Sequence, residues 1–338
     1  MSKLMFTTAL TGAALAAQVA GAQEVVVGMF GGSFAEAAAE CHVAPFEEQT
    51  GASVITQNSN SSQFAAQVRA TGGDSDFDVV YIDNSFAEQL AAEGLLQQLD
   101  MEKLSNSGDL VDGAVGADGH YVQYQWGATA LAYNPEAFDE KPTSWSAVFD
   151  AANAGKVALP DISGTAGVHF LIAAARLNGG DIDNLDPGYE AIKGITENVA
   201  AYYTQADQII SMFERGEITI APWYPDRAAA AADAGVPVAI SYPEEGAIGI
   251  KVTMIIPEGA ANSEAAYTYI DNALSAEAQT CFANKMYAGP VNTTVTLDGA
   301  AAEAVPPEMF ETLYFPDPAV IAENVADWRR RWQREVTR

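Results

Sequence analysis

The sequence predicts an α/β protein built from two lobes that are each discontinuous in the chain. Strand-like runs rich in β-branched residues alternate with helical runs along most of the 338 residues, which is the pattern of a parallel sheet covered by helices. Several of these strands lead directly into a helix through a corner of small or polar residues. Two strand pairs, at 125–133 and 236–257, are interpreted as crossings between the lobes. We therefore expect each lobe to hold a mixed, mainly parallel sheet flanked by helices, with a hinge of crossover strands between them.

The composition is that of a folded and strongly acidic protein. Hydrophobic residues make up 49% of the chain and charged residues 18%, which indicates a globular protein. The 45 acidic and 16 basic residues give a formal net charge of -29. Nucleic acid and anionic membrane surfaces are excluded as partners because phosphate binding needs basic patches. The acidity either steers a cationic ligand toward the protein or is a general adaptation of its surface for solubility.

The first 22 residues have the pattern of an export signal. Lys3 precedes an apolar run of small residues at 4–19, and Ala20-Gly21-Ala22 forms an A-x-A cleavage site. We expect cleavage after Ala22 and export of the mature chain to the periplasm.

Two cysteines, Cys41 and Cys281, remain in the exported chain. An oxidising compartment and an even count favour a disulfide between them, which would tie the late chain to the first helix. Two separate buried thiols are the alternative. The sequence holds no C-x-x-C pair and no Cys/His spacing typical of a metal site.

The first half of the chain starts with a strand at 25–29 that passes through the corner 30–33 into a helix at 34–49. The nearly continuous apolar run FDVVYI at 77–82 is typical of a strand buried on both faces, and it ends in a second corner at 83–85. We further expect strands at 52–57, 120–125 and 129–133, and helices at 63–70 and 86–93.

The second half repeats the alternation. A strand at 156–159 enters a corner at 160–167, and a strand at 218–221 enters another at 222–227. The remaining expected elements are helices at 145–152, 168–177, 189–201, 209–215, 228–234, 265–274, 276–286, 306–315 and 318–334, and strands at 236–241 and 250–256.

The corners carry the candidate ligand-binding residues. In an open α/β sheet, ligands bind at the carboxyl ends of the strands, where helix N-termini present free N–H groups. Apolar walls with a few polar groups are typical of small-molecule clefts, and acids can pair a cation while Arg227 can bind a carboxylate. The candidates are Phe30, Gly32, Ser33, Asp83, Asn84, Trp126, Ser163, Thr165, Trp223, Tyr224, Asp226, Arg227 and Glu245.

Each candidate also has an ordinary structural interpretation. Trp126 and Trp223 are equally well explained as core residues. The polar residues at 161–165 are explained as a helix cap, because short polar side chains favour that position. A fifth corner of this kind, at 126–129, follows the strand expected at 120–125. The recurrence of five similar corners favours a cleft more strongly than any single residue does.

No catalytic signature accompanies these corners. The sequence lacks a G-x-S-x-G elbow, a P-loop and an H-E-x-x-H motif, and no cofactor or resident metal is expected. An exported enzyme that uses Asp83 or Asp161 remains an alternative function. The adjacent pair Tyr202 and Tyr203 leaves a ferric-iron-binding protein as a second alternative, because iron takes hard oxygen ligands.

An ordered series of segments resembles the extracellular solute-binding proteins of bacterial ABC importers, specifically the spermidine/putrescine-binding group. It covers most of the mature chain. The series runs through VVVGMFGGSF, FDVVYIDNSF, YQWGATALAYNPEAF, FERGEITIAPWYPDRAAA, PEEGAIGIKVTMIIP and AGPVNTTV. The resemblance implies a first lobe at 23–130 and 252–298 and a second at 131–251 and 299–338, which close on a ligand at a hinge. It also implies delivery of the ligand to a permease by a monomeric binding protein, and it adds Asn292 to the candidates.

The sequence departs from that group at two places that bear on the ligand. Polyamine binders of the group have an aromatic residue and an acid where this chain has Ile250 and Val252. The turn 163–167 is neutral where they carry acids, and such a turn suits an anionic group at a helix N-terminus. With Arg227 nearby in sequence, we expect a small amine-bearing ligand, either a polyamine or an amino-acid-like zwitterion.

Overall fold

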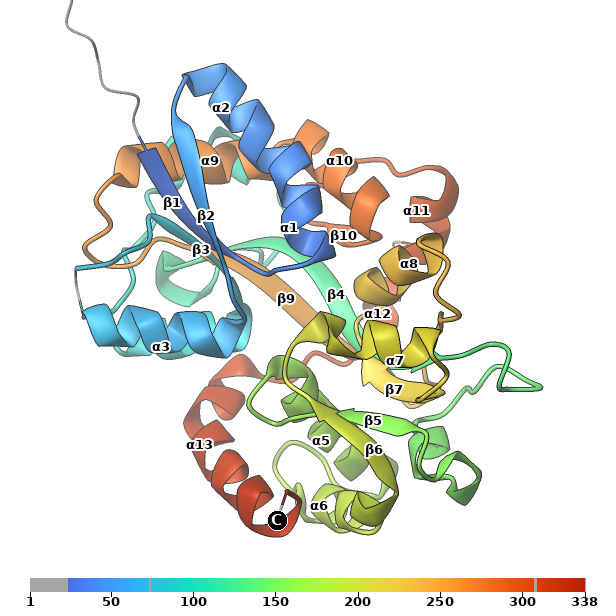
Figure 1. The fold of residues 1–338 in the computed structure, drawn as a ribbon. Helices are drawn as coiled ribbons and strands as arrows, with labels where there is room; N and C mark the ends of the chain where they lie inside the picture. The colour runs from blue at the N-terminus through green and yellow to red at the C-terminus, as the bar shows by residue number, and fades with distance from the viewer. Residues whose placement is uncertain (1–23, 73, 307–308, 338) are drawn as a thin grey trace, which may run out of the picture.

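The computed structural model of the chain describes residues 24–72, 74–306 and 309–337. It consists of two α/β lobes, and the strands of both lobes are hydrogen-bonded in one continuous sheet (Figure 1). The export signal predicted at 1–22 lies outside the described residues. No helix in the described part of the chain is long and apolar enough to cross a bilayer.

The first lobe is built on three parallel strands. Strand β1 (Glu24–Met29) lies between β2 (Ser53–Asn58) and β3 (Val79–Asp83). Side chains alternate between the two faces of β1, so Val25 and Val27 enter one core cluster while Val26 packs against another. The covering helices are α1 (Ser33–Ala38), α2 (Ala44–Thr50), α3 (Ser61–Thr71), α4 (Asn84–Ala92), α9 (Ser263–Leu274) and α10 (Ala276–Met286).

The second lobe has its own parallel group. Strand β5 (Val157–Pro160) lies between β6 (Val199–Tyr203) and β7 (Ile220–Trp223), and the short strand β8 (Ala239–Ser241) pairs with β4. The helices of this lobe are α5 (Thr165–Leu177), α6 (Asp186–Lys193), α7 (Ile210–Glu214), α8 (Pro225–Asp233) and α13 (Pro318–Glu335). Two core clusters fill this lobe, one containing Phe170 and the other Trp223.

Two long strands run between the lobes. Strand β4 (Val122–Tyr133) pairs with β9 (Ile248–Ile255) up to Thr129 and then with β7 from Ala130. Strand β9 in turn pairs with β3 of the first lobe, and the two-residue strand β10 (Gly289–Pro290) pairs with β4. The expected strands at 120–125 and 129–133 are therefore one continuous strand, and the crossover arrangement predicted from the sequence is confirmed.

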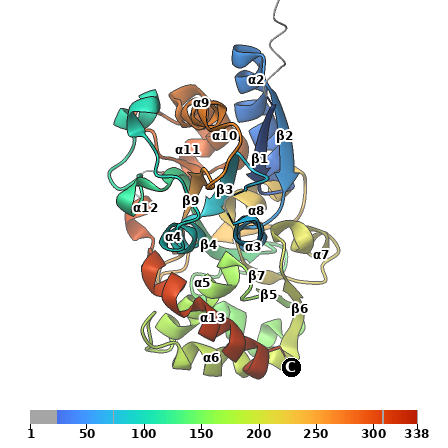
Figure 2. The same cartoon turned by 90° about the vertical axis from the view of Figure 1, so that its left-hand side faces the viewer.

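The end of the chain touches both lobes. Helix α11 (Gly299–Ala304) and helix α12 (Met309–Thr312) precede α13, and Val305 and Leu313 belong to the core of the first lobe. Helix α13 then runs along the second lobe and contacts α4 of the first (Figure 2). Of the helix predicted at 306–315, the described residues form one turn, α12, which ends at Thr312.

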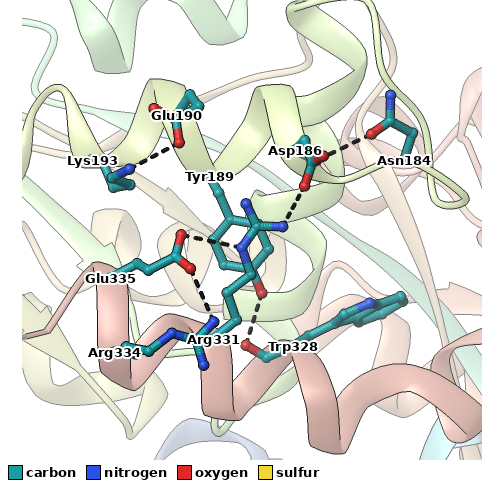
Figure 3. Close-up of polar contacts among 9 residues, drawn as sticks. All are labelled: Asn184, Asp186, Tyr189, Glu190, Lys193, Trp328, Arg331, Arg334 and Glu335. Carbon is teal, nitrogen blue, oxygen red and sulfur yellow. Dashed lines mark hydrogen bonds and ion pairs between the residues drawn. The ribbon is translucent and has the colours of Figure 1, made fainter.

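Helix α13 is held on the second lobe by one arginine and one tyrosine (Figure 3). The Arg331 guanidinium bonds Asp186 and Glu335 and lies 4.0 Å from the centre of the Tyr189 ring. The Tyr189 hydroxyl donates to the carbonyl oxygen of Trp328 at 2.7 Å. These contacts make α13 part of the second lobe.

Three expected helices end earlier or take another form. The helix expected at 189–201 stops at Lys193, and Val199 begins strand β6, because β-branched and tyrosine side chains at 199–203 suit a strand beside β5. The segment expected to be helical at 145–152 forms two short 3₁₀ turns, Trp145–Phe149 and Ala151–Asn153. The first helix contains a π turn, Ala39–Val43, between α1 and α2.

That π turn carries one half of a disulfide. Cys41 is bonded to Cys281 of α10, with 5.6 Å between the two Cα atoms. The predicted disulfide is therefore present, and it joins two segments of the first lobe that are 240 residues apart in sequence.

Candidate functional site

A cavity of about 310 Å³ lies between the lobes, on one face of the crossing strands β4 and β9. Its walls come from the corner after β1, the N-terminal end of α3, and Asp83 in the first lobe. The second lobe contributes the N-terminal end of α5, the loop 204–207 and the corner after β7. Sequence-distant corners therefore meet at one place, as expected for the carboxyl ends of strands in an α/β sheet.

The corner after β1 forms a close-fitting wall. Phe30 lines the cavity with its ring edge-on to Phe34, at 5.1 Å between ring centres. Gly32 has a φ of 63°, and a Cβ atom there would lie 1.6 Å from the Oδ2 atom of Asp207. Two features favour glycine at this position: a backbone with φ 63° and ψ -141°, which residues with a side chain rarely adopt, and the close approach of the Asp207 carboxylate from the opposite lobe.

Asp83 lies at the contact between the lobes. Its Oδ2 atom accepts hydrogen bonds from Ser61 of α3, at 3.0 Å, and from Thr165 of α5. The pKa of the Asp83 carboxyl is raised to about 6, chiefly by burial; the two hydroxyl donors lower it and the negative charge of Asp226 adds a smaller rise within that value. A buried carboxylate that keeps a high pKa in spite of two donors lacks a cationic partner.

Arg227 of α8 reaches across the cleft to the first lobe. Its Nη1 atom donates to the carbonyl oxygen of Gly31 at 2.8 Å and to Ser33 Oγ at 2.9 Å. The same atom lies 3.5 Å from Asp207 Oδ2. The bonds to Gly31 and Ser33 join the two lobes, so they exist only when the lobes are together, and the Arg227 side chain is then buried.

The other polar groups of the cavity are mainly acceptors. Burial raises the pKa of Asp226, and the charge of Asp207 adds to that rise, while Arg227 lowers it. The Oδ1 atom of Asp207 and the Oε1 atom of Gln125 are buried without a hydrogen-bond partner in the described residues. Buried acceptors without donors are unfavourable unless a ligand or water supplies the donor. The cavity therefore suits a ligand that donates hydrogen bonds and carries positive charge.

The two features that suggested a binding site for an anion are occupied by the protein itself. At the start of α5, the Thr165 hydroxyl donates a hydrogen bond to the Asp83 carboxylate, and the backbone amide of Ala166 donates to the Tyr224 hydroxyl at 3.2 Å. Arg227 is engaged by the Gly31 carbonyl and by Asp207. An anionic ligand group would have to displace these contacts.

Seven of the predicted residues line the cavity and an eighth lies directly beside it. The eighth is Ser33, which accepts the hydrogen bond from Arg227. The seven are Phe30, Gly32, Asp83, Thr165, Tyr224, Asp226 and Arg227.

The two tryptophans do not line this cavity. Trp223 is fully buried between α7 and α8, where its indole N–H donates to the carbonyl oxygen of Ala206 at 2.7 Å and its ring stacks on Phe213. Trp126 lies edge-on to Phe310 of the C-terminal tail, in the core of the first lobe. Both sit on the side of their strand that faces the core, which composition alone does not reveal.

The remaining four predicted residues hold other parts of the chain. The amide of Asn292 donates to Leu274, and Glu245 accepts from Ser144 and from the backbone of Trp145. Asn84 lies in a different cavity. The carbonyl oxygen of Ser163 accepts from Arg329 at 3.0 Å.

Two loops of the cavity are not among the sequence-derived candidates. The N-terminal end of α3, at 60–62, has the sequence pattern of a helix cap only, and Asn60 does cap this helix. The loop 204–207 follows strand β6, a segment whose sequence favours a helix, so the corner after it is not apparent from the sequence. Because residues 199–203 (VAAYY) form a strand, the polar residues at 204–207 that follow them make a sixth corner at the end of a strand.

The structure gives no support to the iron-binding pair. Tyr202 packs against Trp332 on one side of β6, and Tyr203 lies in the core on the other side, where its hydroxyl donates to Pro222. Neighbouring residues of a strand face opposite ways, so the two hydroxyls cannot share an ion. No group of three or more His, Cys, Asp or Glu side chains in the described residues is arranged to hold a metal.

Comparison with known proteins identifies relatives over most of the chain. The sequence profile of the family described as "Bacterial extracellular solute-binding protein" matches residues 42–308. The spermidine/putrescine-binding periplasmic protein of Escherichia coli K12 is 29% identical over 238 residues, which cover 67% of this chain and 66% of that protein. The gamma-aminobutyric acid-binding protein of Pseudomonas aeruginosa is 25% identical over 308 residues, covering 86% and 84%.

Solved structures agree with the fold. The PBP AgtB from Agrobacterium tumefaciens R10, solved in complex with agropinic acid, has a TM-score of 0.80 at 22% identity and covers 94% of this chain and 99% of its own. The resemblance seen in the sequence and the two-lobe α/β fold are therefore both confirmed.

Proposed function

The chain belongs to the bacterial extracellular solute-binding proteins, and from this membership we propose that it captures an amine-bearing solute between its lobes and delivers it to an ABC permease. Proteins of this family are transport components, so the chain is not an enzyme. The export signal at 1–22 fits this role, since it would place the protein in the periplasm. The hinge is formed by β4 and β9, and the bound solute lies where Arg227 closes against Gly31.

One observation supports the amine more than any other: the buried polar atoms left without a partner in the described part of this cavity are acceptors. Asp207 Oδ1 and Gln125 Oε1 have no hydrogen-bond donor among the described residues, and the carboxyls of Asp83, which is buried, and Asp226, which is half-buried, repel one another. An ammonium group supplies several N–H donors and a positive charge at once. The rings of Phe30 and Tyr224, together with the aliphatic Ile250 and Val252, provide apolar surface for the alkyl chain.

A diamine or polyamine agrees best with the charges. Among the described residues, three carboxyls face the cavity against a single arginine, which is already bonded to Gly31 across the cleft and lies beside Asp207 of its own lobe. The names of the relatives, which include spermidine and putrescine binders, support the same class.

A zwitterion such as an ω-amino acid is the second candidate. Its ammonium would bind the same cavity carboxylates as a diamine does. Its carboxylate would lie at the N-terminal end of α3, where Asn60, Ser61 and Ser62 line the cavity. The relative named as a gamma-aminobutyric acid-binding protein supports this alternative.

A thermal-shift panel tests the proposal. Ligand that binds only the folded protein raises its apparent stability by mass action. We expect putrescine and spermidine to raise the Tm most, γ-aminobutyrate less, and betaine and butyrate not at all, because betaine has no N–H donor and butyrate no positive charge. In Asp83→Asn the shifts should largely vanish, whereas in Asp139→Asn, which removes an exposed carboxylate outside the cavity, they should persist. Equal shifts with butyrate, or none with any amine, would refute the proposal.

A further inference from the structure

A second cavity, of about 170 Å³, lies on the opposite face of the crossing strands. Successive residues of β9 face the two cavities in turn. Ile250 and Val252 line the ligand cavity, and Gly249 and Lys251 line the second cavity. The corner after β3 divides in the same way. Asp83 faces the ligand cavity, and Asn84 lines the second cavity.

Lys251 is the one basic side chain that lines this second cavity among the described residues. It is half-buried, and burial alone lowers the pKa of its ammonium, with no carboxylate close enough to raise it. The ammonium lies 5.8 Å from the centre of the Phe315 ring. In a chain with a net charge of -29, a partly desolvated lysine without an acidic partner is unusual, because burying a charge is unfavourable unless a counter-charge accompanies it.

Neutral polar groups complete the lining. Ser85, Gln123 and His169 are each more than nine-tenths buried and line this cavity. His169 is held by Thr129 at 3.1 Å, and burial lowers the pKa of its ring to about 3, so it is uncharged near neutral pH. Ser85 lies in the first turn of α4, whose N-terminus carries no side-chain cap. Hydroxyl, amide and ammonium donors thus surround one small space.

We propose that this second cavity binds a small monocarboxylate, with Lys251 as its counter-charge and Ser85 and Asn84 as hydrogen-bond donors. A single positive charge and neutral donors suit one negative charge. A dianion is disfavoured by Asp317, whose exposed carboxylate also lines the cavity, and by the net charge of the protein.

The two cavities are coupled through the hinge. The second cavity takes walls from α4 of the first lobe and from His169 and Ile321 of the second, so its shape depends on how the lobes are arranged. In the closed arrangement it has room for a small ligand. A carboxylate that binds there more tightly when the lobes are together stabilises closure, and by linkage it strengthens capture of the solute on the other face by the same factor.

Acetate is the probe, with sodium chloride at equal ionic strength as its control. We expect acetate at tens of millimolar to raise the Tm of the unliganded wild-type protein by about 2 °C or more, and chloride to do less. Lys251→Met removes the ammonium and keeps the length of the side chain, and should abolish the acetate shift. Lys141→Met, which makes the same charge change on an exposed loop, should retain it, and Ser85→Ala should reduce it.

The coupling is measured separately with putrescine. Saturating acetate should lower the dissociation constant of putrescine about fivefold in the wild type and leave it unchanged in Lys251→Met. Because the acetate shift is measured without amine, it tests the second cavity even if no amine binds the first. An acetate shift that chloride reproduces, or one that survives in Lys251→Met, would overturn the proposal.

Discussion

The Nη1 atom of Arg227 lies 2.8 Å from the carbonyl oxygen of Gly31, 196 residues earlier in the chain and in the opposite lobe. This contact buries a guanidinium at the edge of a cavity that holds three carboxyls. It gives Arg227 a different role from the one that the sequence suggests. The side chain closes the cleft and offsets part of its negative charge, and it is not free to bind the carboxylate of a ligand.

Gly32→Ala should prevent this closure. A Cβ atom at residue 32 would overlap the Asp207 carboxylate, so Asp207 must turn away from Arg227 or the lobes must separate, and either change weakens the closed contact. We expect the affinity for amine to fall at least tenfold, measured by calorimetric titration. The backbone at this position, with φ 63° and ψ -141°, is disfavoured for alanine and adds a loss of about 1–3 kcal/mol in the free energy of unfolding.

Two alanine variants separate closure from strain. Gly51 also has a positive φ, 71° with a ψ of 4°, and a Cβ atom added there would have no neighbour within 4 Å. Gly51→Ala should therefore lose about 1 kcal/mol in the free energy of unfolding and keep its affinity. Gly31→Ala, whose Cβ would lie 3.6 Å from its nearest neighbour, should also keep it. If Gly32→Ala bound amine as tightly as these controls, the closed contact would be irrelevant to capture.

Amine affinity should rise with pH across the titration of Asp83. Burial raises the pKa of this carboxyl to about 6 from an ordinary 3.8. In the ligand-free protein its contribution to stability is full below pH 3.8 and is lost as the pH rises through about 6. An ammonium binds the ionised form, so we expect roughly tenfold tighter putrescine binding at about pH 7 than at about pH 5. Titrations at constant ionic strength measure this ratio, and Asp83→Asn should flatten it; a wild-type affinity that is independent of pH contradicts the assignment.

Trp223→Ala should damage the fold and not the ligand site alone. The side chain is fully buried, its indole N–H is bonded to Ala206, and it stacks on Phe213. We expect a loss of about 3–5 kcal/mol in the free energy of unfolding, measured by urea denaturation. Tyr224→Phe, one residue later, removes only a hydroxyl from the cavity wall and should change stability far less. Equal stability losses in the two variants would contradict the core position of Trp223.

Reduction of the disulfide should weaken the first lobe. Cys41 and Cys281 close a very long loop, and in the chain-entropy description such a bond stabilises by about 3–5 kcal/mol. We expect the Cys41→Ser, Cys281→Ser double variant to lose stability in this range by urea denaturation, while the amine affinity of its folded fraction stays close to that of the wild type. A double variant as stable as the wild type would show that the bond contributes little.

The corners that line the cavity are the most predictable part of the site. The glycines at 31–32, Asp83, Thr165 and the run Tyr224–Asp226–Arg227 each stand where an apolar strand ends, and parallel strands bring such ends together. The family resemblance then locates the cleft between lobes.

The sequence does not predict which way each side chain faces or which residue of the other lobe it contacts. Trp223 and Tyr224 are adjacent, yet one lies in the core and the other in the cavity, because a strand turns successive residues to opposite faces. The contacts Arg227–Gly31 and Asp83–Thr165 depend on how the two lobes meet, which no local pattern encodes. The loop containing Asp207 escapes prediction because a helical pattern before it conceals strand β6.

Calorimetric titration of putrescine into the wild-type protein and Asp83→Asn, at about pH 7, tests amine capture at the closed cleft most directly. Asp83 supplies a buried charge that only a cationic donor can satisfy, and loss of a charge-assisted bond weakens binding by about 10- to 100-fold. We expect saturable binding of one putrescine per wild-type chain and a loss of that size in Asp83→Asn, with Asp139→Asn unchanged. Wild-type affinity in Asp83→Asn would contradict the proposal that this carboxylate holds the amine.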